Sequence, residues 1–225
     1  FPYTTLFRSA SRAHQSNDQF PRSTKEPKYI AIIGGKGAMG TLYTRIGNQT
    51  GHEVFAIDKD NWDTLDEIAP KLDLAIVSVP IHVTSDVINE LAPKLNKNTV
   101  LADFTSNKSQ PLQAMMEAHD GPVVGLHPMH GPDVPNLSKQ LMVVCEGRQM
   151  DATDWFIQQC DLWGMRIKEA DPKKHDHVMH MVQGLRHFVA LLHGSFMRYY
   201  DLNPDDILDF SSPIYRAELM MTGRI

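Results

Sequence analysis

The alternation of short apolar runs with helical segments, from Lys28 to about residue 170, constrains the fold of this chain most. The runs "KYIAIIGG", "HEVFAID", "LDLAIVSVP", "NTVLADF" and "GPVVGLH" are apolar and rich in β-branched residues, and segments such as "HVTSDVINELAPKL" separate them. Continuous apolar strands are buried on both faces, which is typical of a parallel sheet covered by helices on each side. "LMVVCEG" and "GMRIKEA" add strands near the edge. The sequence therefore predicts an α/β fold with a doubly wound, mostly parallel sheet.

A glycine-rich stretch, "IIGGKGAMG", directly follows the first apolar run. Its spacing is G-x-G-x-x-G, with a strand before it and a helix after it, which is the context of a dinucleotide-binding loop. In such loops the first glycine permits a tight turn, the second lets a pyrophosphate approach the backbone, and the third lets the helix pack closely. The motif predicts a Rossmann-type domain. The expected cofactor contacts in the loop are Gly35, Gly37, Ala38, Met39 and Gly40.

Two further groups of residues fit a cofactor at the same sheet edge. Asp58 closes "HEVFAID", where a Rossmann-type domain places the acid that binds the adenine ribose. A carboxylate there repels a 2′-phosphate, so we expect NAD rather than NADP. Ser78, Val79 and Pro80 end the third run, where the cofactor would lie, although a plain turn with proline is the structural alternative.

A histidine ends the fifth run, in "VVGLHPMHGPD". Because the carboxyl ends of parallel strands face the ligand crevice, His127 should point toward the same space as Ser106 and Lys108, which follow the fourth run. An imidazole has an unperturbed pKa of about 6.5, so it can take a proton from a hydroxyl while a hydride leaves the same carbon. A histidine that only caps the end of a strand is the structural alternative.

Several motifs occur in the order found in one enzyme family. "GGKGAMG", "IVSVPIHVT", "PLQAMMEAHDGPVVGLHPMHGPD", "KHDH", "LRHF" and "SSPIYRAEL" together resemble the prephenate dehydrogenases, over about residues 28–225. The likeness is greatest to the dehydrogenase half of the bacterial bifunctional chorismate mutase–prephenate dehydrogenases. It implies that the protein oxidises and decarboxylates prephenate with NAD, giving 4-hydroxyphenylpyruvate for tyrosine biosynthesis. It also implies a homodimer in the full-length form.

The resemblance assigns roles to single residues. His127 in "LHPM" matches the catalytic histidine that hydrogen-bonds the ring 4-hydroxyl, and Ser106 in "TSNK" matches a serine that orients this histidine and reaches the nicotinamide. His187 in "LRHF" matches a histidine of the substrate pocket. Arg216 in "PIYR" and Arg224 in "TGR" match arginines tied to substrate binding. Guanidinium groups suit this substrate, because it carries two carboxylates that they can bind bidentately.

Lys108 is expected to be a further cationic contact to the substrate. The family usually has Phe at the position of His130 and often Val at that of Asn107, so the pocket should differ in detail. An arogenate dehydrogenase, which acts on the amino-acid analogue, stays open as an alternative. So does an NAD-binding domain without turnover, because the family's helical domain continues beyond residue 225.

The eleven histidines raise the question of a metal site. His175, His177 and His180 lie close together, and His187 falls on the same helical face as His180. There is no H-E-x-x-H pattern and no cysteine pair at zinc spacing, so we expect no metal. His175, His177 and His193 are expected to be solvated or to pack against the cofactor domain.

The two ends of the chain and its composition predict its domain boundaries, partners and location. Residues 1–27 show no sustained helix or strand period and should form a disordered tail or linker, which is too short for a chorismate mutase. Residues 28–170 should form the dinucleotide-binding domain. Residues 171–225 should form the start of a truncated helical domain for substrate binding and dimerisation. A net charge of −5 with no basic stripe disfavours a nucleic-acid partner. Two cysteines and no long apolar run predict a cytoplasmic protein without a membrane partner.

Overall fold

The computed structural model describes residues 20–222. Their contacts divide the chain into two units, the first ending at His175 and the second beginning at Asp176. Arg224 and most of the expected N-terminal linker lie outside the described residues. The sequence places the domain boundary after residue 170, whereas the first turn of the helix that follows packs with the first unit.

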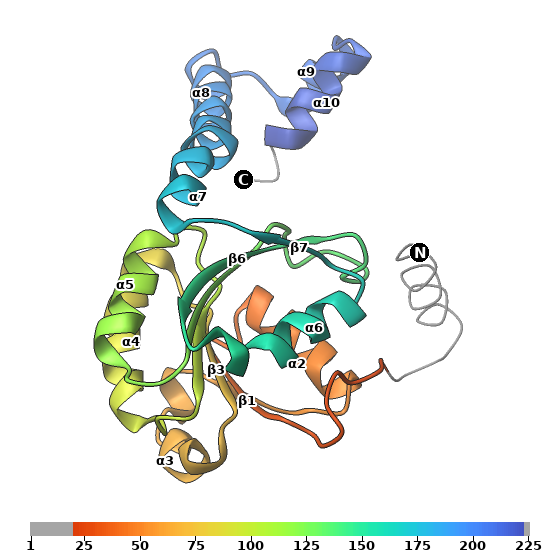
Figure 1. The fold of residues 1–225 in the computed structure, drawn as a ribbon. Helices are drawn as coiled ribbons and strands as arrows, with labels where there is room; N and C mark the ends of the chain where they lie inside the picture. The colour runs from red at the N-terminus through yellow and green to blue at the C-terminus, as the bar shows by residue number, and fades with distance from the viewer. Residues whose placement is uncertain (1–19, 223–225) are drawn as a thin grey trace. The chain divides into compact units, whose positions relative to one another are not determined.

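Within the described residues, the first unit holds one seven-stranded sheet (Figure 1). The strands are β1 (Tyr29–Ile33), β2 (Glu53–Ile57), β3 (Leu74–Val77), β4 (Val100–Asp103), β5 (Val123–Pro128), β6 (Leu141–Arg148) and β7 (Arg166–Glu169). Their order is β2-β1-β3-β4-β5-β6-β7, and all neighbours are parallel except β5 and β6. This confirms the predicted doubly wound, mostly parallel sheet.

Helices cover both faces of this sheet. They are α2 (Ala38–Gln49), α3 (Thr64–Ile68), α4 (Thr84–Leu91), α5 (Ser109–Ala118) and α6 (Asp154–Leu162). Short 3-10 helices connect them: η1 (Lys59–Asn61), η2 (Ala69–Lys71), η3 (Ile81–Val83), η4 (Ala92–Lys94) and η5 (Met150–Ala152). In Figure 1, α2 and α6 lie on one face, while α4 and α5 lie on the other. The short α3 was not expected, because five residues carry too little periodicity for a sequence-based prediction.

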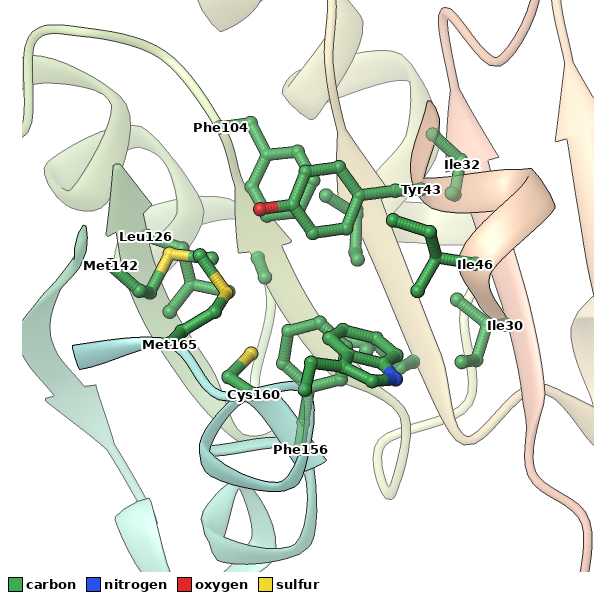
Figure 2. Close-up of a cluster of buried hydrophobic side chains, with 14 of the residues drawn as sticks. Ile30, Ile32, Tyr43, Ile46, Phe104, Leu126, Met142, Phe156, Cys160 and Met165 are labelled. Atoms are coloured by element: carbon green, nitrogen blue, oxygen red, sulfur yellow. The ribbon is translucent and has the colours of Figure 1, made fainter. Parts of the chain in front are cut away.

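Alternate residues of each strand enter two separate cores. On β1, Ile30 and Ile32 face α2 and α6, whereas Ala31 and Ile33 face the α3, α4 and α5 side. This is the period of two that a strand imposes, with both faces buried as in other parallel sheets. Figure 2 shows the first core, where Tyr43 packs on Phe104 with ring centroids 4.6 Å apart. The apolar runs of the sequence are therefore explained by burial on both sides.

The segment before β1 is attached to α6. The backbone amide of Ser23 donates to Gln159 Oε1 at 2.8 Å, and the Ser23 hydroxyl donates to the carbonyl oxygen of Trp155 at 2.7 Å. Gln159 also donates to the carbonyl of Pro21, and Phe20 packs against the first core. The expectation of a disordered linker is therefore wrong for residues 20–27. They form no regular element, but Pro21 and Ser23 are hydrogen-bonded to α6.

The second unit is helical, as predicted. Its elements are α7 (Pro172–Met179), which spans the division, the π-helical η6 (His180–Leu185), α8 (Arg186–Tyr199), α9 (Pro204–Asp209) and α10 (Pro213–Thr222). Many large apolar side chains lie on its surface; examples are Met181, Phe188, Leu191, Phe196, Tyr199, Phe210 and Ile214. No helix in the described part of the chain combines the length and apolar character that a membrane crossing needs.

Candidate active site

The turn between β1 and α2 is packed too tightly for side chains. Gly34 has a φ of +83°, and a Cβ there would lie 2.3 Å from the carbonyl oxygen of Ser78. A Cβ on Gly35 would lie 2.5 Å from Cα of Ala56, and one on Gly40 would lie 2.3 Å from the carbonyl oxygen of Gly34. The left-handed residue is therefore Gly34, one position before the motif, while Gly35 permits contact with β2 and Gly40 lets α2 pack on the turn.

The start of α2 fits a pyrophosphate. Gly37 is the N-cap residue, no side chain caps the helix, and its first turn holds no acidic residue. A Cβ on Gly37 would have only the carbonyl oxygen of Gly34 within 4 Å, so a ligand can approach the backbone there. The first amides of a helix attract anions, because they lack partners within the helix and lie at the positive end of its dipole. The motif therefore has the geometry that phosphate binding requires.

Asp58 lies beside this turn. Its Oδ2 accepts a hydrogen bond of 2.7 Å from the backbone amide of Lys36, and its own amide donates to Oδ1 of Asn61 at 2.7 Å. These contacts hold the carboxylate at the carboxyl end of β2, next to the glycine turn. Ser78, at the end of β3, donates its amide to the carbonyl of Ile33 at 2.7 Å. The residues expected to bind the cofactor thus adjoin one another across β2, β1 and β3.

The strand order extends this edge toward His127. A topological switch lies between β1 and β3, because the chain moves outward to β2 and then returns to the other side of β1. β5 lies three strand spacings from β1, or about 14 Å. A dinucleotide whose pyrophosphate rests on the glycine turn can therefore extend past β3 toward the ends of β4 and β5. Ser106 follows β4 and is exposed, and His127 lies near the end of β5.

His127 is buried and bonded to a second histidine. It is 4% exposed and pairs with Val143 of β6 in the antiparallel register. Its Nδ1 lies 2.9 Å from Nε2 of His175, which is also 4% exposed, and the two rings meet edge to face at 77°. Of the two alternatives for His175, packing against the cofactor domain is the one observed. No local sequence pattern predicts this contact, because it joins residues 48 positions apart.

The structure corrects the expectation for Lys108. This side chain is fully buried and forms an ion pair with Asp103, which is also fully buried. Its ammonium group also donates to the carbonyl oxygen of Leu126 at 2.7 Å, and its stem passes Gly125, where a Cβ would lie 3.3 Å from Lys108 Cδ. Lys108 therefore joins the ends of β4 and β5 from inside instead of facing a substrate. Burial raises the pKa of the Asp103 carboxyl, and the Lys108 ammonium opposes this shift.

The unusual His130 links the loop after β5 to α2. Its Nε2 lies 3.1 Å from the hydroxyl of Tyr43, and its Nδ1 lies 2.9 Å from the carbonyl oxygen of Gly131. Because that carbonyl only accepts, Nδ1 carries the proton and Nε2 accepts from the tyrosine hydroxyl. Burial lowers the pKa of His130, which favours this neutral form. A phenylalanine could not make this link, so His130 has a polar role between the loop and α2.

His187 and Arg216, the described residues of the second unit that are expected to bind substrate, lie outside its groove. His187 is exposed on α8. Arg216 donates to the carbonyl oxygen of Leu208 at 3.0 Å and to Oγ of Ser211 at 3.2 Å. A groove of about 840 Å³ lies among α8, α9 and α10, and neither His187 nor Arg216 lines it. In the described ranges, no three His, Cys, Asp or Glu side chains are grouped so that they could hold a metal ion.

Comparison with known proteins identifies the family. Residues 43–163 match the family model described as "Prephenate dehydrogenase, nucleotide-binding domain". The chain is 41% identical over 215 residues to the T-protein of Enterobacter agglomerans, covering 96% of this chain and 57% of that protein. It is 38% identical over 219 residues to the T-protein of Haemophilus influenzae, covering 97% and 58%. The chain thus spans less than two thirds of these relatives.

A solved structure shares the fold at much lower identity. It is the prephenate dehydrogenase from A. aeolicus in complex with hydroxyphenyl propionate and NAD+, with a TM-score of 0.73 and 14% identity over 88% of this chain and 79% of that one. The family model covers more than half of the chain, from the middle of α2 through the end of α6. This chain therefore belongs to the prephenate dehydrogenase family, which it matches in the nucleotide-binding domain.

Proposed function

We propose that this chain is the dehydrogenase part of an NAD-dependent prephenate dehydrogenase, which makes 4-hydroxyphenylpyruvate for tyrosine biosynthesis. One observation carries the proposal: in a nucleotide-binding domain of this family, the sheet edge that holds the glycine turn also holds His127. A cofactor on the glycine turn and an imidazole at the end of β5 can thus act on one substrate molecule. The two T-protein relatives and the NAD+ bound to the A. aeolicus protein support it.

The geometry of the edge supports the proposed cofactor contacts. The turn at Gly35 and Gly37 and the first turn of α2 receive the pyrophosphate, with Ala38, Met39 and Gly40 in that turn. Asp58 accepts hydrogen bonds from the adenine ribose and repels a 2′-phosphate, which favours NAD over NADP. Ser78, Val79 and Pro80 lie beside the cofactor where it crosses from β1 toward β4, and Ser106 reaches its nicotinamide.

The chemistry needs little from the protein beyond orientation and one proton acceptor. NAD, when bound, accepts the hydride that leaves C4 of prephenate. As it leaves, the 4-hydroxyl proton moves toward Nε2 of His127, and the electron pair of the bond to the lost carboxylate enters the ring. CO₂ departs, the ring becomes aromatic, and the oxygen takes the proton back from His127 and ends as a phenol. His127 thus acts as a general base or hydrogen-bond acceptor on that oxygen.

The doubly anionic substrate also needs cationic and polar contacts. We assign these to His187 and Arg216 in the helical unit and to Arg224. Planar guanidinium groups bind carboxylates bidentately, which orients the ring as well as holding it. The apolar surface of the helical unit supports a homodimer of the full-length protein, because such surfaces are usually covered by a partner. The cytoplasm is the proposed location.

The test is the appearance of NADH absorbance with prephenate, arogenate or chorismate as substrate, each with NAD and with NADP. We expect turnover of prephenate with NAD, little with NADP and none with chorismate. Faster turnover of arogenate would assign the chain to the alternative substrate, and NADH binding without turnover of any substrate would make it a nucleotide-binding fragment. A preference for NADP would contradict the role of Asp58.

A further inference from the structure

His127 and His175 are two buried histidines whose imidazole rings are in contact. Nδ1 of His127 lies 2.9 Å from Nε2 of His175, and both residues are 4% exposed. At this distance one nitrogen must donate a proton and the other must accept it. The direction of this hydrogen bond decides which nitrogen of His127 carries its proton.

His175 owes its position to the start of α7. The amide of Ala170, just after β7, donates to the carbonyl oxygen of Val144 on β6 at 3.0 Å. Asp171 then caps the helix, because its Oδ1 accepts from the amide of Lys174 at 2.9 Å and its carbonyl accepts from the amide of His175 at 2.8 Å. The start of α7 is thus held at the end of β7, next to β6, and His175 in its first turn contacts His127 of β5.

Only one direction of this hydrogen bond suits a general base. If His127 donates from Nδ1, the lone pair of its ring lies on Nε2, which can accept the hydroxyl proton. If His175 donates instead, the proton of His127 lies on Nε2 and the ring cannot accept there. Once His127 becomes an imidazolium, the neutral His175 still accepts from Nδ1, and the charged donor strengthens the bond.

We propose that His175 is a positioning residue for His127: its Nε2 accepts the Nδ1 proton of His127 and so places the basic lone pair on Nε2. The assignment rests on the proposed function of His127 as the group that takes the hydroxyl proton. It adds His175 to Ser106, the residue to which the family resemblance assigns the orientation of this ring.

The other groups around His127 are consistent with a neutral acceptor. Lys108 passes Gly125, two residues before His127 on the same face of β5, but it is paired with the carboxylate of Asp103. The cross-strand neighbour on β6, Val143, is apolar. The positive charge of Lys108 is therefore compensated by Asp103, and Nε2 of His175 lies within hydrogen-bond distance of Nδ1 of His127.

Three variants test the proposal by steady-state kinetics. His175→Leu removes the acceptor, and we expect kcat to fall about 10- to 100-fold while the affinity for NAD stays unchanged. His175→Gln places an amide oxygen near the position of Nε2, and we expect it to recover most of kcat. The control is His119→Leu, which removes another buried histidine whose Nε2 lies 2.8 Å from the carbonyl of Thr99, before β4. It should cost stability but leave kcat per folded enzyme unchanged.

Either of two kinetic results would overturn the proposal. One is a wild-type kcat in His175→Leu. The other is a loss in His175→Gln as deep as in His175→Leu, which would mean that the ring serves packing and not proton placement.

A measurement without turnover separates this proposal from the proposed function. In the wild-type chain at mildly alkaline pH, nitrogen-15 NMR of the imidazoles should show the proton of His127 on Nδ1, and His175→Leu should shift it toward a mixture of tautomers. A proton on Nε2 in the wild type would overturn the proposal whether or not the enzyme turns over. The expected tautomer in a chain that does not oxidise prephenate would support the placement by His175 and reject the proposed function.

Discussion

Single residues at the ends of β4 and β5 carry charges that the interior must accommodate. Lys108 is fully buried, and it is tolerated there because Asp103, a carbonyl oxygen and the space above Gly125 receive it. Burying an isolated ammonium group would be very costly, so the pair must form as a unit. The sequence placed Lys108 at this sheet edge correctly. The sequence could not show whether the Lys108 side chain points into the protein or toward a ligand. That direction depends on the space that Gly125 leaves on the neighbouring strand because it has no side chain.

Replacing Lys108 should destabilise the protein, because it leaves the buried carboxylate of Asp103 without its cation. In Lys108→Met we expect the free energy of unfolding at neutral pH to fall by about 3–5 kcal/mol. Burial raises the pKa of Asp103, so the folded variant keeps a proton that the unfolded chain releases. Its stability is therefore fully present below the usual carboxyl pKa of about 4 and is lost as the pH rises through the raised value. Urea denaturation at several pH values measures this.

The matched control is Lys94→Met. Lys94 forms an ion pair with Asp66 at 2.6 Å, but this pair lies at the surface. Surface pairs contribute about 0–1 kcal/mol, so the control should lose little stability at any pH. A Lys108→Met variant as stable as Lys94→Met, or one that gains stability as the pH rises, would contradict the account of a buried pair.

At the scale of elements, the sequence was most informative where the pattern is local. The apolar runs predicted all seven strands, and the G-x-G-x-x-G spacing predicted α2 directly after β1. Two features depend on contacts between distant segments and could not be predicted in this way. The left-handed turn falls at Gly34 because Ser78 of the neighbouring strand lies against it, and residues 20–27 are ordered because α6 offers partners to Ser23.

The packing of α2 on the glycine turn gives a prediction for Gly40. A Cβ in Gly40→Ala would lie 2.3 Å from the carbonyl oxygen of Gly34 and 2.6 Å from Cα of Gly35, so the backbone must move. We expect a loss of about 1–3 kcal/mol of stability and about a tenfold weaker binding of NADH, because the first turn of α2 shifts. Chemical denaturation and a fluorescence titration with NADH measure the two effects.

A glycine with open surroundings provides the control for this substitution. Gly194 lies inside α8, and a Cβ there would meet nothing within 4 Å. Gly194→Ala should therefore stabilise the protein by about 0.5–1 kcal/mol, since alanine loses less conformational freedom in a helix. Equal stabilities for the two alanine variants would show that α2 does not need its third glycine.

At the scale of the whole molecule, the chain combines a domain built on a seven-stranded sheet with a helical unit that has many exposed apolar side chains. The sequence predicted both parts, because the change from strands to helices after Pro172 is a change of period. It assigned substrate contacts to His187 and Arg216 only through the family resemblance, and those assignments remain predictions. What the fold itself supplies is one sheet edge that holds the glycine turn, Asp58 and His127.

The most direct test of this account is the initial rate of NADH formation from prephenate and NAD, measured at 340 nm, for the wild-type chain and for His127→Asn, together with the NADH dissociation constant of each. The account predicts that kcat falls about 100-fold or more in the variant, while the dissociation constant changes by less than roughly twofold. Unchanged turnover in His127→Asn would contradict it, because the imidazole at the end of β5 would then take no part in the reaction.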